Sequence, residues 1–290
     1  MRLLRVGPPG AERPAVRDAD GRFRDLSSLT PDICGAFLAG DGVARARAAL
    51  AAGDLPEVLG VQLTGEESPV RVGAPVARPG KVVCIGLNYR DHAAETGAPV
   101  PDRPVVFLKD PATVIGPYDR VLVPRRSRKT DWEVELAVVI GRKARYLDSP
   151  AAADDVIAGY AISNDVSERE FQLEFSGQWD LGKSCETFNP LGPLLVTPDE
   201  VADPQGLGLR LWVNGTPRQH GHTGNMVFDV RYLIWYLSQY LVLEPGDVIN
   251  TGTPAGVALG RPDAPYLRAG DVLELEIDGL GRQRQIVGQA

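Results

Sequence analysis

The sequence predicts a β-rich α+β protein with only a few packed helices. Its 290 residues include 32 glycines and 24 prolines, and so many turn-forming residues argue against a helical bundle. Short apolar runs rich in β-branched residues recur along the chain and are separated by turn sequences. Only one segment has the regular apolar spacing of a well-defined amphipathic helix.

The first part of the chain is expected to form a small N-terminal domain, residues 1–73. Its polar residues do not cluster in a chemically suggestive way. Glycine and proline are frequent around its end, in Gly73-Ala74-Pro75 and Arg78-Pro79-Gly80, so residues 74–290 are expected to form a second, larger domain. The elements expected in the first domain are strands at 3–6 and 58–63 and a helix at 43–52.

Most of the expected strands lie in residues 74–290. Asn214-Gly215 directly follows one of them and is a strong hairpin signal, and Gly279-Leu280-Gly281 indicates a second hairpin. The helix expected at 230–241 has apolar residues at three- and four-residue spacing, and Pro245-Gly246 would close it. The strands are expected at 82–85, 105–108, 121–123, 134–140, 157–162, 209–213, 272–277 and 283–287.

Composition and charge exclude several classes of function. The chain has 31 Lys and Arg against 38 Asp and Glu and no basic run, so it lacks the positive face of a nucleic-acid-binding protein. It has no run of 18 apolar residues and no apolar signal-peptide core, so neither a membrane span nor export is expected. Three widely spaced cysteines do not form a disulfide framework, so we expect a cytoplasmic protein.

Two glutamates introduce a strongly apolar strand. Glu133 and Glu135 are two residues apart, so in a strand their side chains point to the same face. The apolar run that follows would place both carboxylates at the mouth of a core. Neighbouring carboxylates repel each other unless a cation lies between them, and oxygen ligands favour a hard ion such as Mg²⁺ or Mn²⁺. The alternative is a solvated strand face, which is common at this spacing.

A third acidic residue, Asp165, follows another apolar run. A carboxylate at the end of a buried strand is costly without a partner, which again indicates a metal. Alternatively, Asp165 could cap the N-terminus of the next segment. If that segment is helical, Arg169 and Gln172, four and seven residues later, share a face with Asp165.

His92 is the histidine in the most reactive-looking setting. It precedes Glu95 by three residues, so one helical turn would bring them into contact, and a carboxylate beside an imidazole favours general-base catalysis. This short helical segment could act as a lid. The alternative is a surface helix with an incidental pair. His220 and His222 are expected to be exposed loop residues rather than metal ligands.

Residues Gly177 to Ser184 match the phosphate-loop pattern G-x-x-x-x-G-K-[ST]. That loop needs a buried strand before it and a long helix after it. Here a charged segment precedes the match, and the segment from Asn189 to Pro193 would stop any helix. We interpret the match as accidental, which leaves Lys183 to be explained.

Taken together, the motifs resemble those of the fumarylacetoacetate hydrolase superfamily. They occur in the family's order and cover essentially all of residues 80–287, and residues 1–72 resemble the small N-terminal domain of many bacterial members. Near Asn88 the chain lacks the fourth acidic ligand of fumarylacetoacetate hydrolase itself, as do the shorter acylpyruvase-type members. The matching stretches are residues 81–92, 107–109, 131–141, 164–167, 191–193 and 243–257.

The resemblance implies a mixed β-sandwich roll with a small N-terminal domain, a homodimer, and a bound Mg²⁺ or Mn²⁺. The residues it implicates are the metal ligands Glu133, Glu135 and Asp165, the catalytic residues His92, Glu95 and Lys183, and the substrate-binding residues Arg169, Gln172 and Thr253.

The implied reaction is hydrolysis of a C–C bond in a 2,4-dioxo acid, either an acylpyruvate or a 2,4-diketo-3-deoxy sugar acid. His92 would deprotonate a water that attacks the 4-carbonyl, Lys183 would stabilise the oxyanion, and pyruvate and a carboxylic acid would be released. A second hypothesis is an oxaloacetate decarboxylase or keto-enol isomerase, which would use the same metal site without an attacking water. A third is a nucleotide-binding protein that uses residues 177–184.

Overall fold

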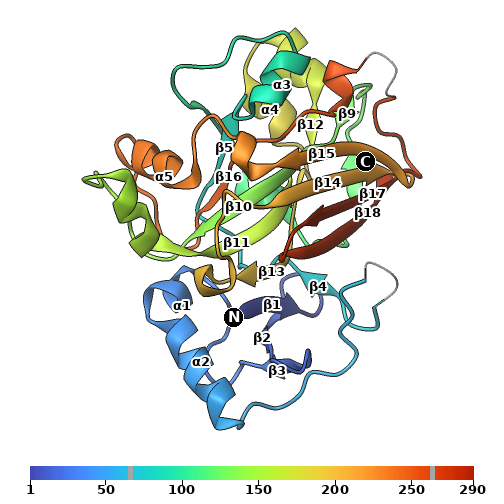
Figure 1. Cartoon of the computed structure of the whole chain (residues 1–290). Helices are drawn as coiled ribbons and strands as arrows, with labels where there is room; N and C mark the ends of the chain where they lie inside the picture. The colour runs from blue at the N-terminus through green and yellow to red at the C-terminus, as the bar shows by residue number, and fades with distance from the viewer. Residues whose placement is uncertain (65–67, 262–264) are drawn as a thin grey trace.

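Two β-sheets and a small strand pair dominate the computed structural model, which describes residues 1–64, 68–261 and 265–290 (Figure 1). The strands are β1 (Arg2–Val6), β2 (Arg13–Arg17), β3 (Phe23–Asp25), β4 (Val72–Gly73), β5 (Val82–Gly86), β6 (Val105–Lys109), β7 (Val114–Ile115), β8 (Val121–Val123), β9 (Thr130–Asp131), β10 (Val134–Ile140), β11 (Ile157–Asn164), β12 (Ser167–Glu168), β13 (Asn189–Val196), β14 (Gly208–Val213), β15 (Thr216–His222), β16 (Val248–Asn250), β17 (Val272–Ile277) and β18 (Gly281–Gln289).

The helices are short. The α-helices are α1 (Gly35–Ala39), α2 (Gly42–Ala52), α3 (Arg90–Glu95), α4 (Trp179–Lys183) and α5 (Val230–Ser238). A π-helical segment, η3, spans Glu170–Phe175, and the 3-10 segments are η1 (Pro111–Thr113), η2 (Pro150–Val156), η4 (Pro198–Glu200), η5 (Thr223–Asn225) and η6 (Ala258–Gly260). In the part of the chain that the structure describes, no helix is long and apolar enough to span a bilayer.

The larger sheet has the order β3-β2-β1-β13-β11-β10-β16-β5-β6, with β4 added on β1 and β7 on β13. It is mixed, because β16 and β5 run parallel whereas β10 is antiparallel to both β11 and β16. The smaller sheet has the order β15-β14-β17-β18-β8. The predicted β-rich, mixed-sheet fold with few helices is therefore confirmed.

Strand β10 contributes side chains to two layers of the core. Leu136 and Val138 belong to the cluster that includes Leu209 and Leu275 of the smaller sheet, whereas Ala137 belongs to a second cluster on the other face. A strand buried on both faces needs a continuous apolar run, which explains the sequence from Val134 to Ile140 apart from its single acid.

Residues 1–73 lie at one end of the molecule, and α3 and α4 lie at the other (Figure 1). Strand β1 pairs with β13, with Leu3 opposite Leu195, so the larger sheet continues from residues 74–290 into the N-terminal part. Whether residues 1–73 also behave as a separate domain stays a prediction.

Two local expectations are wrong. No strand forms at 58–63, because Gly60 has a φ of +77° that interrupts an extended run, and Val58 instead donates a single backbone hydrogen bond to Phe23 (2.8 Å). Helix α5 ends at Ser238 rather than at 241. The amides of Tyr240 and Leu241 both bond to the Leu237 carbonyl and so tighten the last turn.

The Asn214-Gly215 hairpin is confirmed between β14 and β15. Both residues have a positive φ, +51° and +72°, as a two-residue hairpin turn of this kind requires.

Candidate active site

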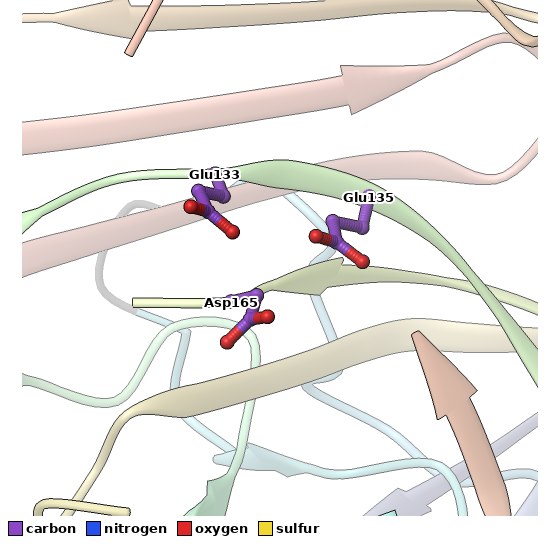
Figure 2. Close-up of side chains that lie close together, drawn as sticks. All are labelled: Glu133, Glu135 and Asp165. Carbon is purple, nitrogen blue, oxygen red and sulfur yellow. The ribbon is translucent and has the colours of Figure 1, made fainter. Parts of the chain in front are cut away.

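Three carboxylates converge where β10 begins and β11 ends. Glu135 lies in β10, Glu133 directly precedes it, and Asp165 directly follows β11 (Figure 2). The antiparallel pairing of the two strands brings these positions together, and the Asp165 amide bonds to the Glu133 carbonyl (2.9 Å). Each side chain is buried and offers one oxygen, and these oxygens all lie within 4.8 Å of one another. The acid pair and the third acid predicted from the sequence therefore form one cluster, the acid cluster.

Buried cations compensate part of this negative charge. Lys183 Nζ donates to Glu133 Oε2 (2.9 Å) and to Asp165 Oδ2 (3.0 Å). Arg169 Nη2 donates to Glu133 Oε1 (2.6 Å), and its Nη1 donates to Gln172 (3.0 Å). Lys183 and Arg169 therefore lie in direct contact with the acid cluster.

The two glutamates have opposite electrostatic environments. Burial raises the pKa of Glu133, but the charges of Lys183, Arg169 and His92 outweigh it, so the net shift lowers that pKa. Burial and the like charges of Asp165 and Glu133 hold the pKa of Glu135 well above its usual value. The Gly252 amide donates to Glu135 Oε2 (2.8 Å).

His92 and Glu95 lie on α3, one turn apart as predicted. His92 Nδ1 is 3.8 Å from Glu95 Oε2, which is too long for a hydrogen bond. This nitrogen is buried and has no hydrogen-bond partner among the described residues. Glu95 accepts a bond from the Gly256 amide (2.8 Å). Burial raises the pKa of Glu95, but the neighbouring His92 and the Gly256 amide lower it further than burial raises it.

One cavity of about 460 Å³ joins these groups, which is within the usual range for a small-molecule site. Thr253 also lines it and is held by bonds to the Val134 carbonyl (3.0 Å) and from Gln219 (2.7 Å). Among the predicted site residues, those that line the cavity are His92, Glu95, Glu133, Glu135, Arg169, Gln172, Lys183 and Thr253. Asp165 is not among the lining residues, but it belongs to the acid cluster.

Two residues of the site were not predicted from the sequence as site residues. Lys109, on β6, is buried and bonds to Asp165 Oδ1 and to the Val166 carbonyl (3.0 Å). Asp131 accepts a bond from Arg169 Nε (2.9 Å) and from the Ala258 and Leu259 amides. The alternation of side chains along a strand could have indicated that both residues face the site. Lys109 shares a buried strand face with Phe107, and Asp131 lies two residues before Glu133.

Residues 177–184 do not form a phosphate loop. They include α4, a helix of five residues, and the π-helical segment η3 rather than a buried strand precedes them. Lys183 instead bonds to two carboxylates of the acid cluster. The Asp165 side chain also does not cap a helix, because both of its oxygens bond to lysines and the next element is strand β12. The helix comes only after Arg169.

His220 and His222 are exposed as expected, but the expectation that they lie in a loop is wrong. They belong to β15, which pairs with β14 after the hairpin at Asn214-Gly215 and extends to residue 222. They are two positions apart in this strand, so both side chains lie on its exposed face.

The chemistry of the acid cluster suits a divalent metal. Its donor atoms are all carboxylate oxygens, they are close together, and they are shielded from water. Burial and the like charges of its neighbours disfavour the ionised form of Glu135 in particular, and a cation between the carboxylates would remove the repulsion. The residues therefore fit a hard ion of the Mg²⁺ or Mn²⁺ type.

Comparison with known proteins gives one family. Residues 81–288 match the sequence family described as fumarylacetoacetate (FAA) hydrolase C-terminal. A protein of Burkholderia multivorans is 54% identical over 291 residues, covering 100% of both chains, and its name is no more specific than hydrolase.

Two solved structures extend the comparison. Maleylpyruvate hydrolase from Sphingobium sp. SYK-6, crystallised with manganese(II) and pyruvate, is 29% identical with a TM-score of 0.81, and 100% of both chains is covered. The 2-hydroxyhepta-2,4-diene-1,7-dioate isomerase from Mycobacterium marinum is 33% identical with a TM-score of 0.74, covering 100% of this chain and 98% of the other. The similar proteins thus include both a hydrolase and an isomerase.

Proposed function

The chain belongs to the fumarylacetoacetate hydrolase family, an enzyme superfamily of hydrolases and isomerases, and from that premise we propose a specific reaction. The protein would be a divalent-metal-dependent hydrolase that cleaves the C–C bond of a 2,4-dioxo acid into pyruvate and a carboxylic acid. The substrate would be an acylpyruvate or a 2,4-diketo-3-deoxy sugar acid. The observation that carries the proposal is that Glu133 and Glu135 of the acid cluster line the same cavity as the His92–Glu95 pair.

Charge supports an anionic substrate. The buried groups in contact at the site comprise four acids, Asp131, Glu133, Glu135 and Asp165, and three cations, Lys109, Arg169 and Lys183. A bound Mg²⁺ or Mn²⁺ would act as a Lewis acid that stabilises negative charge on substrate oxygens, and it would leave the whole group with a net positive charge. Such a site favours a carboxylate-bearing substrate.

The side chains of the cavity can carry out the remaining steps. His92 Nδ1 faces Glu95, which leaves Nε2 to accept a proton from the water that attacks the 4-carbonyl. Lys183 uses two N–H groups on Glu133 and Asp165, and no described residue takes the third, which would donate to the developing oxyanion. Cleavage of the C3–C4 bond then releases the acid, and the electron pair passes to the enolate of pyruvate, which His92 protonates.

The second candidate is a decarboxylase of oxaloacetate or a keto-enol isomerase at the same site. The isomerase among the similar structures favours it. These reactions need stabilisation of an enolate but no attacking water. The His92–Glu95 pair has a use in hydrolysis that it lacks in decarboxylation, and for this reason we place hydrolysis first.

Metal removal is the first test of the proposed function. Exhaustive chelation is expected to abolish pyruvate release from acylpyruvates, because it removes the cation from the acid cluster. Adding Mg²⁺ or Mn²⁺ should restore the activity. Glu135→Gln should remove the metal-induced rise in melting temperature. Full activity of the chelated protein would refute a metal-dependent mechanism.

The second test separates the two candidate reactions. His92→Ala is expected to lower kcat/KM for acylpyruvate hydrolysis by roughly 10²- to 10⁴-fold, which is the usual contribution of a positioned base. Oxaloacetate decarboxylation should fall far less, because no water must be activated. His220→Ala is the matched control, since His220 is exposed on β15. An unchanged hydrolysis rate in His92→Ala would exclude His92 from the mechanism.

We also propose that the protein acts as a homodimer in the cytoplasm, with a small-molecule dioxo acid as its ligand. Light scattering of the purified protein gives its mass in solution and tests the dimer directly.

A further inference from the structure

The cavity has an apolar half that the proposed chemistry does not use. Phe107 marks the border, because Lys183 Nζ lies 4.9 Å from the centroid of its ring. The Trp179 ring meets Phe107 edge-on, with centroids 5.4 Å apart and an interplanar angle of 63°. The other apolar side chains that line the cavity are Ile85, Leu87, Ala98, Leu173 and Leu259.

Trp179 is fixed as a wall of this half. A Cβ atom on Gly86 would lie only 2.6 Å from Trp179 Cζ3, so the indole rests directly against the backbone of β5. Between Gly86 and Phe107 the indole has little room to move. Large aromatic surfaces held in this way form a preorganised apolar contact area.

Leu87 reaches the cavity at a conformational cost. Its φ is +54°, a region that bulky side chains rarely adopt. The neighbouring Asn88 fixes this turn, because it donates to the Thr251 carbonyl (2.7 Å) and accepts from the Phe228 amide (2.9 Å). Glycine would adopt the same backbone without strain. A strained leucine that lines a functional cavity indicates that the side chain itself has a use there.

The cations of the cavity are paired with carboxylates, including Lys183, which lies beside the Phe107 ring. Among the described residues that line the cavity, the permanent cations are Arg169 and Lys183, and both are bonded to the acid cluster. A carboxylate against Leu87 and Trp179 would lose its hydration without gaining a counter-ion. An apolar chain would gain from leaving water at the same place.

We propose that Leu87, Phe107 and Trp179 form the subsite for the acyl group and select 2,4-dioxo acids whose acyl group is an apolar alkyl or aryl chain. Acyl groups that end in a carboxylate, or that carry the hydroxyls of a sugar acid, are disfavoured. The inference rests on the proposed function, because it assumes that the dioxo acid end binds at the acid cluster. These three residues determine specificity and take no part in proton transfer.

The test compares pyruvate release by the Mg²⁺-loaded full-length protein from three substrates. Hexanoylpyruvate has the apolar chain, glutarylpyruvate has a chain of similar length that ends in a carboxylate, and acetylpyruvate has almost no chain. We expect kcat/KM for hexanoylpyruvate to exceed each of the others at least tenfold, since each buried methylene contributes about fourfold. Equal or faster turnover of glutarylpyruvate overturns the inference and leaves the hydrolase function intact. No pyruvate from any of the three overturns the inference, and the absence of pyruvate from a 2,4-diketo-3-deoxy sugar acid as well overturns the proposed function with it.

Two substitutions of Leu87 test the subsite itself. Leu87→Lys keeps a side chain at the strained backbone but adds a cation, so the preference for hexanoylpyruvate over glutarylpyruvate should fall at least tenfold. Leu87→Gly relieves the strain and removes the side chain, so the preference for hexanoylpyruvate over acetylpyruvate should fall while the melting temperature does not. If both variants keep the wild-type preferences for hexanoylpyruvate over glutarylpyruvate and over acetylpyruvate, the assignment is overturned.

Tyr146→Gly is the matched control for backbone strain. Tyr146 has a φ of +50° and is 63% exposed, and it follows the end of β10 that points away from the acid cluster. This substitution relieves the same kind of strain, so the melting temperature should respond as in Leu87→Gly. Both substrate preferences should stay at their wild-type values. A change in either preference would show that strain relief, rather than the subsite, alters specificity, and would overturn the assignment.

Discussion

Lys109 is a buried cation whose polar partners are oxygens at the acid cluster. It is 1% exposed, it bonds to Asp165 and to the Val166 carbonyl, and its Nζ lies 5.9 Å from the centroid of the Phe188 ring. Removing Lys109 leaves Asp165 with Lys183 (3.0 Å) as its one remaining cationic partner among the described residues, so part of a buried charge is no longer compensated. Lys109→Met is therefore expected to lower the free energy of unfolding of the metal-free protein by roughly 3 kcal/mol, measured by urea denaturation.

A surface pair provides the control for this prediction. Lys143 forms an ion pair with Glu244 (3.0 Å), but the two side chains are 61% and 47% exposed, so Lys143→Met should change the free energy of unfolding by at most about 1 kcal/mol. Equal stabilities of the two variants would show that Lys109 does not compensate Asp165.

At the level of residues, the sequence predicted the acidic residues of the site more completely than the cations that bond to them. Alternation alone places Glu133 and Glu135 on one face, so their proximity follows from local geometry. The Lys109–Asp165 contact joins residues 56 positions apart and depends on the order of strands in the larger sheet. That order could not be derived from local sequence patterns. Lys183 and Thr253 were predicted to share the site only because of the family resemblance.

Side chains at both ends of helix α3 bond to backbone groups of neighbouring segments. Glu95 accepts the Gly256 amide, and Arg90 donates to the Met226 carbonyl (2.6 Å). A Cβ atom on Gly260 would lie 2.5 Å from Glu95 Cγ, so the glycine at this position of η6 makes room for the Glu95 side chain. The position of the His92–Glu95 pair therefore depends on a neighbouring segment.

Gly260→Ala is predicted to displace the Glu95 side chain and so to misalign His92. We expect kcat/KM for acylpyruvate hydrolysis to fall by about 10- to 100-fold, because misplacement of about 1 Å can cost that much. Metal-induced stabilisation should persist, since the acid cluster is untouched. Gly206→Ala is the control, because a Cβ there meets only ordinary contacts of 3.5 Å or more. Equal kcat/KM values for the two variants would contradict the prediction.

At the level of elements, regular patterns were predictable and interruptions were not. The expected strands from 82–85 onward correspond to β5, β6, β8, β10, β11, β14, β17 and β18, because alternation or a continuous apolar run defines each of them. The run at 58–63 has similar residues but adopts no strand, since Gly60 bends the chain and Leu59 is 75% exposed. Strand β15 carries mostly exposed polar residues and was recognisable only through the hairpin before it.

In the molecule as a whole, the N-terminal part is joined to the rest by the larger sheet and by a group of ion pairs. Arg71 binds Glu12 (2.9 Å) on one side and Asp119 (2.8 Å), in the second part of the chain, on the other. Arg5 also reaches Glu12 (3.3 Å). Burial raises the pKa of Glu12, but hydrogen bonding to Arg71 and the charges of Arg5 and Arg71 outweigh it, so the pKa of this carboxyl is lowered.

Glu12→Gln tests this connection through the pH dependence of stability. A carboxyl whose pKa is lower in the folded state stabilises the protein fully above its unfolded value of about 4.5, and this contribution is lost as the pH falls through the folded value. The variant should therefore be less stable than the wild type at pH 7, by roughly 1 kcal/mol because partial exposure screens the pairs. The two unfolding curves should converge in acid. Glu57→Gln is the control, since Glu57 is 40% exposed in its side chain and lies 4.0 Å from Arg24, and it should match the wild type throughout. A stability difference for Glu12→Gln that persists unchanged into acid would mean that lost packing, rather than the charge of Glu12, explains the effect.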